Sequence, residues 1–104
     1  MDVFEALADP TRRRVVQLLS SRPHRAGELA DTTGMSQPAM SRHLKILLMS
    51  GIIADERVRE DARVRLFKLQ PDSLVAVQAF LDQLQAEWHI QLRSFTRHVE
   101  AKSR

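Results

Sequence analysis

Apolar residues recur every three or four positions through the first half of the chain, which is the period of an amphipathic helix. The period predicts four helices, over residues 3–8, 10–21, 25–32 and 37–50. Their core-facing residues are Val15, Leu18, Leu19, Ala26, Leu29, Ala30, Met40, Leu44, Leu47 and Leu48. Asp9-Pro10 suits the start of the second helix and Ser36 the start of the fourth. Gly34 suits the turn between the last two helices, and Gly51 suits the end of the fourth.

The second half of the chain has a different pattern. Residues 52–69 alternate more loosely and are rich in Ile, Val, Phe and Arg, which predicts strands at about 52–58 and 63–69 around a polar turn at Glu60-Asp61-Ala62. A long helix should follow from Pro71 to about residue 100. Its apolar stripe consists of Val77, Leu81, Leu84, Trp88, Leu92, Phe95 and Val99. A stripe of this length exceeds what a small domain covers, so we expect it to pack against a second copy.

Composition narrows the class of protein. The chain has 104 residues, which suits a single domain over 1–104. It has no cysteine, which excludes disulfides, thiolate metal ligands and a thiol nucleophile. Apolar runs fall short of the roughly 20 residues that span a bilayer, and MDVFEALADP carries acids where a signal peptide carries bases. We therefore expect a cytoplasmic protein that does not enter a membrane.

The fourth predicted helix has an unusual charge pattern. Two short helices joined by a glycine-containing turn, over about 25–50, form a helix-turn-helix pattern. The chain has 13 acidic residues, yet none falls between Thr32 and Ala54. An amide, hydroxyls, a guanidinium and an ammonium share one side of the fourth helix and can donate to base edges or phosphates. The predicted DNA-binding residues of this helix are Ser36, Gln37, Pro38, Ser41, Arg42 and Lys45.

The predicted hairpin, over about 52–69, is also basic. Four arginines surround its turn and should contact phosphates or a neighbouring minor groove: Arg57, Arg59, Arg63 and Arg65. Glu60 and Asp61 at the tip reduce this positive charge. A basic hairpin directly after a candidate recognition helix has the properties of a wing.

These features together resemble the ArsR-type winged-helix transcriptional repressors. The segments that carry the resemblance are FEALADPTRRRVVQLL, SQPAMSRHLKILLMSGII and ARVRLFKL, and it extends from Val3 to about Glu100. FLDQLQAEWHIQLRSF resembles the SdpR-like branch, which lacks the usual metal sites. One departure is Ala62, where many members have glycine. Because Asp61 tolerates positive φ better than alanine does, the turn is expected to shift by a residue.

The resemblance implies a mostly α fold with a small hairpin, and a repressor that binds a two-fold symmetric operator. It implies binding to double-stranded DNA through Gln37, Ser41 and Arg42, supported by the wing. It also implies a homodimer built on the first and last helices, the last one spanning about 71–100. The residues expected at the dimer interface are Val3, Phe4, Leu81, Leu84, Trp88, Leu92 and Phe95.

The histidines and acids do not form a familiar metal site. His89 and His98 lie nine residues apart, on opposite faces of a helix, so one chain cannot use both for one metal. A site across a dimer, with His98 and Glu100 as donors, is the less favoured reading beside solvated histidines. We predict no cofactor and no metal, and a small-molecule effector stays open. His24 is expected to be exposed, and His43 either contacts a phosphate or packs against the domain.

Other residues also have two interpretations. Arg12, Arg13 and Arg14 either contact phosphates or form a solvated face, in which one pairs with Glu5 or Asp9. Trp88 suits a core or an interface better than an effector pocket.

Two other functions compete with DNA binding. Winged helices also dock proteins, so the alternative is an interaction module without specific DNA readout. An acid-free helix face argues against it, because a protein-docking face has no need to exclude carboxylates. Catalysis is disfavoured, since the chain has no cysteine, no glycine-rich phosphate loop and no convergent set of His and acids.

Overall fold

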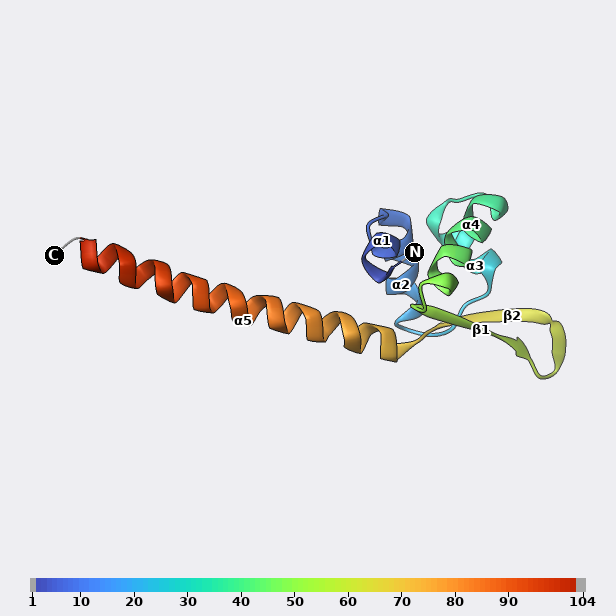
Figure 1. The fold of residues 1–104 in the computed structure, drawn as a ribbon. Coiled ribbons are helices and arrows are strands. Elements are labelled where there is room, and N and C mark those ends of the chain that lie inside the picture. The colour runs from blue at the N-terminus through green and yellow to red at the C-terminus, as the bar shows by residue number, and fades with distance from the viewer. Residues whose placement is uncertain (1, 103–104) are drawn as a thin grey trace. The chain divides into compact units, whose positions relative to one another are not determined.

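The computed structural model describes residues 2–102 of the chain and contains helices and one antiparallel hairpin within that range (Figure 1). The elements, in order, are α1 (Val3–Leu7), α2 (Pro10–Leu19), α3 (Ala26–Thr33), α4 (Gln37–Met49), β1 (Ile53–Val58), β2 (Asp61–Leu69) and α5 (Pro71–Lys102). This is the element order that the sequence predicts. Two compact units can be separated, one ending at Leu74 and one beginning at Val75. That residues 1–104 form one domain stays a prediction.

The helices begin and end where the local sequence satisfies the free backbone groups. One carboxylate oxygen of Asp9 accepts hydrogen bonds from the backbone amides of Thr11 at 2.8 Å and Arg12 at 3.1 Å. Gly34 has φ 71° and ends α3, and Gly51 has φ 80° just after α4. These are the left-handed conformations in which glycine avoids a side-chain clash. The predicted caps and stops are therefore confirmed.

A single apolar core holds the first unit together. Its buried residues are Ala6, Val15, Leu19, Leu29, Ala30, Met40, Leu44, Leu47, Ile52, Ile53 and Phe67. Three predicted core residues, Leu18, Ala26 and Leu48, are only half-buried and pack around this cluster. Because residues of α2, α3, α4 and both strands meet in the core, α4 is fixed along its inner side.

The hairpin pairs in a regular register as far as Arg57, which lies opposite Arg65. The register then shifts, so that Val58 lies opposite Asp61, and the connecting turn is Arg59-Glu60. The predicted start of the second strand at residue 63 is therefore wrong by two residues. The predicted turn at residues 60–62 is displaced toward Arg59 as well.

The expected positive φ at Asp61 is also absent. Among the described residues only glycines have positive φ, so the tip accommodates the missing glycine through the irregular register instead. The Asp61 carboxylate stabilises this arrangement by accepting a hydrogen bond from the Arg63 backbone amide at 3.0 Å. Such a bond from an aspartate to an amide two residues on is a common turn-forming interaction.

His24 is buried, which contradicts its expected exposure. Its backbone forms a bridge to Phe67 through two hydrogen bonds, of 3.0 Å and 2.8 Å. The imidazole Nδ1 donates to the carbonyl of Arg22 at 2.8 Å, which satisfies the ring in its buried position. The segment before α3 thus lies against β2 and extends the sheet locally. The local sequence carries no signal for this contact, because His24 and Phe67 lie 43 positions apart along the chain.

The helix α5 is continuous over 32 residues, so it is about 48 Å long at about 1.5 Å per residue. This agrees with the predicted helix from Pro71 to about residue 100. The apolar side chains from Leu81 to Val99 remain exposed in the single chain. None of the helices within residues 2–102 is both long and apolar enough to cross a membrane.

Candidate nucleic-acid interface

The exposed side of α4 is the centre of the candidate interface. Ser36 caps the helix by accepting a hydrogen bond from the Ala39 amide at 3.3 Å. Three residues of the inner side, Met40, Leu44 and Leu47, are buried in the core. Because the helical period places these residues on one side, the other side must face outward. The core therefore determines which residues α4 can present to a ligand.

All the α4 residues predicted to bind DNA are exposed: Ser36, Gln37, Pro38, Ser41, Arg42 and Lys45. Arg42 and Lys45 form no ion pair with any described carboxylate. Their charges are therefore available to an anionic partner. The structure brings these residues onto one surface, and their contact with DNA stays a prediction.

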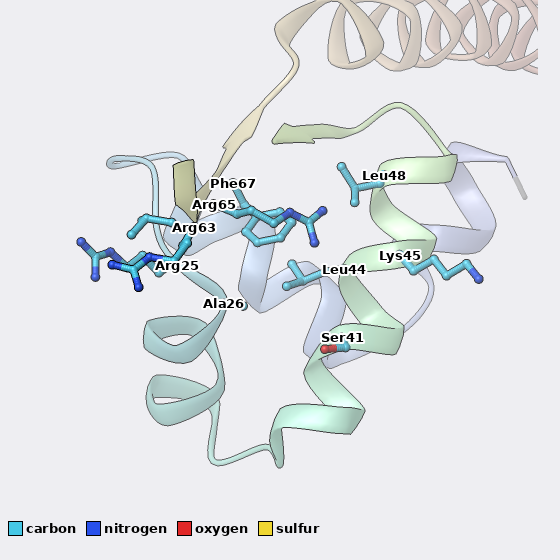
Figure 2. Close-up of a pocket in the computed structure, with 10 residues that line it drawn as sticks. Arg25, Ala26, Ser41, Leu44, Lys45, Leu48, Arg63, Arg65 and Phe67 are labelled. Atoms are coloured by element: carbon cyan, nitrogen blue, oxygen red, sulfur yellow. The ribbon is translucent and has the colours of Figure 1, made fainter. Parts of the chain in front are cut away.

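An open cleft of about 600 Å³ lies between α4, the start of α3 and β2. Its charged lining consists of Arg25, Lys45, Arg63 and Arg65, and its apolar lining includes Leu44, Leu48, Val64 and Phe67. Figure 2 shows Arg25 and Arg63 close together, while Arg65 reaches from β2 toward α4 over the Phe67 ring. The cleft makes the outer side of α4 and the wing one positively charged surface.

Arg25 is a member of this surface that the sequence does not reveal. It precedes α3, and its backbone amide donates to the Glu28 carboxylate at 3.2 Å, while its side chain is free to line the cleft. It lies 16 positions before Ser41 and 38 before Arg63. Only the packing of α3 against α4 and β2 brings these side chains together, so a linear pattern does not identify it.

The wing arginines fall into two groups. Arg65 pairs with Asp55 at 2.7 Å, and its guanidinium lies 5.0 Å from the centre of the Phe67 ring. Arg63 pairs with Asp61 at 3.1 Å, and its side-chain hydrogen bond lowers the pKa of that carboxyl. In contrast, Arg57 and Arg59 are exposed and pair with no described carboxylate. These two therefore keep their full charge for a phosphate.

Arg12 ties α1 to α4 and does not form the carboxylate pair that the sequence suggests. Its Nε donates to the Ala6 carbonyl at 2.6 Å, and its Nη1 lies 3.3 Å from Nδ1 of His43. Arg13 donates to the carbonyls of Leu7 and Ala8 at 3.0 Å and 3.1 Å. Both arginines thus satisfy the free carbonyls at the end of α1. His43 is half-buried, which favours its packing role.

No described part of the chain gathers three or more His, Cys, Asp or Glu side chains into a group that could hold a metal ion. His89 and His98 are exposed on α5. The prediction of no metal and no cofactor therefore rests on the sequence argument. Two acids of the first unit serve structural roles, since Asp9 caps α2 and Glu28 pairs with Arg22 at 2.9 Å.

Comparison with known proteins gives a consistent family. Residues 9–55 match the family described as "Bacterial regulatory protein, arsR family". The HTH-type transcriptional regulator Rv2034 of Mycobacterium tuberculosis is 33% identical over 99 residues, which cover 95% of this chain and 87% of that protein. The transcriptional repressor SdpR of Bacillus subtilis is 41% identical over 56 residues, which cover 54% of this chain and 62% of that protein.

A solved structure shares the fold as well. It is the homodimeric winged helix-turn-helix DNA-binding domain of Mb0332 from Mycobacterium bovis, described as a possible ArsR-family transcriptional regulator. The TM-score is 0.63 at 26% identity, and the match covers 85% of this chain and 78% of that one. The winged helix-turn-helix architecture predicted from the sequence is thereby confirmed.

Proposed function

Since the chain belongs to the ArsR family of bacterial regulatory proteins, we propose that it is a homodimeric repressor that binds a two-fold symmetric DNA operator. Its relatives are named transcriptional regulators, and several of them are named repressors. A protein with this role acts beside the chromosome, in the cytoplasm. Membership of a regulator family gives no reason to assign a catalytic step.

The observation that carries the proposal is the outer side of α4. It is exposed, contains no carboxylate, and is fixed from behind by Met40, Leu44 and Leu47. A carboxylate on this side would be repelled by DNA phosphates, so its absence suits a helix that enters a major groove. A rigid backing matters because base recognition requires side chains held at defined positions.

The side chains of α4 and those of the wing suit different kinds of contact with DNA. The Arg42 guanidinium suits a bidentate contact with the O6 and N7 atoms of guanine, and the Gln37 amide suits adenine. Ser41 and Lys45 suit phosphate or base contacts on the same side. On the wing, Arg57 and Arg59 pair with no carboxylate in the described part of the chain, so they suit phosphates and supply affinity without selectivity.

A dimer supplies the second recognition helix. In two-fold symmetric complexes, two such helices enter successive major grooves about one helical turn apart. The α5 stripe offers apolar surface to a partner, because Leu81, Leu84, Trp88, Leu92 and Phe95 are exposed in the single chain. The α1 residues predicted at the interface are Val3, which is half-buried, and Phe4, which is exposed. Their joint use with α5 is part of the proposal.

Substitution of Arg42 tests the assignment. An electrophoretic shift assay with the upstream region of the protein's own operon should show salt-sensitive binding, and a footprint should show two-fold symmetry. Arg42→Ala should weaken operator binding by about 1–3 kcal/mol and relax the preference at one base pair in each half-site. Arg42 makes no ion pair with the carboxylates of residues 2–102, so the folded state should be unaffected.

Arg42→Lys is the matched control, because it keeps the charge but loses the bidentate geometry. Its nonspecific binding should equal that of the unmodified protein, while selectivity at the same base pair falls. Unchanged operator affinity and selectivity in Arg42→Ala would contradict the site assignment. Absence of any DNA shift in the unmodified dimer would favour the interaction-module alternative.

A further inference from the structure

The cleft between α4, the start of α3 and β2 combines an apolar floor with a positively charged rim. Leu44 and Phe67 are each only 3% exposed, and half-buried Ala26 and Leu48 continue the floor. Figure 2 shows Leu44 and Leu48 extending from α4 toward Arg65. The volume of about 600 Å³ falls within the range of about 300–1,000 Å³ that is usual for small-molecule sites. The cleft is therefore large enough for a small molecule.

DNA binding does not account for the apolar floor of this cleft. Phosphate contacts use the charged groups at the rim and gain nothing from buried leucine and phenylalanine side chains. Base edges in a major groove present mostly hydrogen-bonding groups, apart from the thymine methyl group. None of the described residues that line the cleft is acidic. A ligand that uses both the floor and the rim therefore needs an apolar body and a negative group.

Arg25 is the rim cation that suits the negative group. Arg63 pairs with Asp61 at 3.1 Å. Arg65 pairs with Asp55 at 2.7 Å. In contrast, Arg25 pairs with no described carboxylate, and it is exposed at the edge of the cleft. Because a guanidinium binds a carboxylate through two parallel hydrogen bonds, a ligand with one carboxylate fits this position.

The lining favours an aliphatic body over an aromatic one. The Arg65 guanidinium lies 5.0 Å from the centre of the Phe67 ring and covers that ring, as Figure 2 shows. The apolar groups left open to a ligand belong largely to Ala26, Leu44 and Leu48. These side chains attract a hydrocarbon chain but give an aromatic ring no stacking partner. A flexible hydrocarbon chain therefore suits the floor better than a ring.

We propose that this cleft binds an amphipathic carboxylate with an aliphatic chain, of the fatty-acid class, and that the bound ligand competes with DNA. The carboxylate contacts Arg25, and the chain lies along Leu44 and Leu48. Ser41 and Lys45, which are predicted to contact DNA, line the same cleft. The ligand covers these side chains and adds a negative charge that repels DNA phosphates. The competition, unlike the binding site itself, rests on the DNA binding of the proposed function.

An NMR titration of the isotope-labelled full chain with hexanoate, octanoate and decanoate tests the binding site. Saturable shifts should cluster at the backbone amides of residues 25–26, 41–48 and 63–67, which surround the cleft. Affinity should rise by about two- to fourfold for each added methylene group, because the upper value corresponds to its full burial. The absence of saturable shifts, or shifts confined to α5, would overturn the proposal.

Two further probes separate the contribution of charge from that of apolar surface. Octanol has the chain without the carboxylate, so it should bind at least about fivefold more weakly than octanoate. Inorganic phosphate has charge without a chain, so it should not reproduce the shifts at Leu44 and Leu48. Equal binding of octanol and octanoate would show that no cation is used. Identical shifts with phosphate would show a phosphate-binding surface only, and either result refutes the amphipathic ligand.

Substitutions assign the two ends of the ligand. Arg25→Gln should weaken octanoate binding by about three- to tenfold, while Arg14→Gln, at an exposed arginine outside the cleft, should not change it. Leu48→Asn should reduce the gain in affinity per methylene group, because it makes the floor polar. Met49→Gln is its matched control, since Met49 is exposed on the same helix and does not line the cleft. Equal effects of a cleft variant and its control would contradict the site.

Displacement of operator DNA tests the competition separately. Decanoate should release the operator from the unmodified protein, and the concentration that halves binding should rise by about three- to tenfold in Leu48→Asn. Decanoate binding in the cleft without release of the operator would overturn the competition. Failure of the unmodified protein to bind any operator would contradict the proposed function instead, while the NMR titration still decides whether the cleft binds the carboxylate.

Discussion

Arg12 links the short helix α1 to the recognition helix α4, and its removal gives a measurable prediction. In a continuous helix the Ala6 carbonyl would accept a hydrogen bond from residue 10, but Pro10 has no amide hydrogen. The Arg12 Nε takes that place at 2.6 Å. The Nη2 atom of Arg12 lies 3.3 Å from the Glu5 carbonyl oxygen, and its Nη1 atom lies 3.3 Å from His43 Nδ1.

The size of the effect follows from these contacts. Arg12→Ala leaves the carbonyl of buried Ala6 without its side-chain donor. Loss of a hydrogen bond from a charged donor costs about 1.5–3 kcal/mol, and the two bonds of 3.3 Å, which are long and partly hydrated, add little. We expect the free energy of unfolding to fall by about 2 kcal/mol. For a domain of this size the melting temperature should fall by about 10 °C.

Thermal denaturation followed by circular dichroism measures this loss. Arg14→Ala is the matched control, because Arg14 is exposed on the same helix and its side chain makes none of the hydrogen bonds found for Arg12. The control should change stability by less than about 0.5 kcal/mol. Measuring DNA binding by Arg12→Ala distinguishes this structural role of Arg12 from a direct contact with a DNA phosphate. Well below its melting temperature, Arg12→Ala should keep the salt dependence of the unmodified protein.

Two results would refute the reasoning. Equal destabilisation by Arg12→Ala and Arg14→Ala would show that the positive charge of this helix, and not the hydrogen bonds of Arg12, stabilises the first unit. An unchanged melting temperature in Arg12→Ala, combined with a salt slope reduced by about one, would show that Arg12 contacts a phosphate instead.

Two further predictions concern the wing and the start of α2. In binding titrations at several salt concentrations, Arg57→Ala should weaken binding to all DNA sequences and reduce the salt slope by about one. Arg65→Ala should have a smaller effect on both quantities, because Arg65 pairs with Asp55. A larger effect of Arg65→Ala than of Arg57→Ala would contradict this. The backbone amides of Arg12 and Thr11 donate hydrogen bonds to the Asp9 carboxylate and lower its pKa. The charged Asp9 cap therefore stabilises the fold fully above the ordinary carboxyl pKa, and this stability is lost as pH falls through the lowered pKa. Between about pH 5 and about pH 2, the melting temperature should therefore fall less in Asp9→Ser than in the unmodified protein, because serine caps the helix without titrating. Equal falls in both proteins would refute the role of Asp9.

Local sequence signals were sufficient for most of the fold. Asp9-Pro10, Ser36, Gly34 and Gly51 mark helix ends correctly, because a cap depends on residues within one turn. The wing turn was less accurate, because its position depends on how two strands pair. A family glycine is absent at Ala62, and the hairpin adapts through its register, which no single residue specifies.

The sequence alone determined which side of α4 is available, because the period of 3.6 residues separates Met40, Leu44 and Leu47 from the polar residues on the opposite side. It also determined the apolar stripe of α5. The tertiary structure decided the environment of His24, which is buried against Phe67, and the partners of Arg12. It also placed Arg25 beside the wing. These contacts join residues distant along the chain, and they form only when the packed core fixes helices and strands against each other.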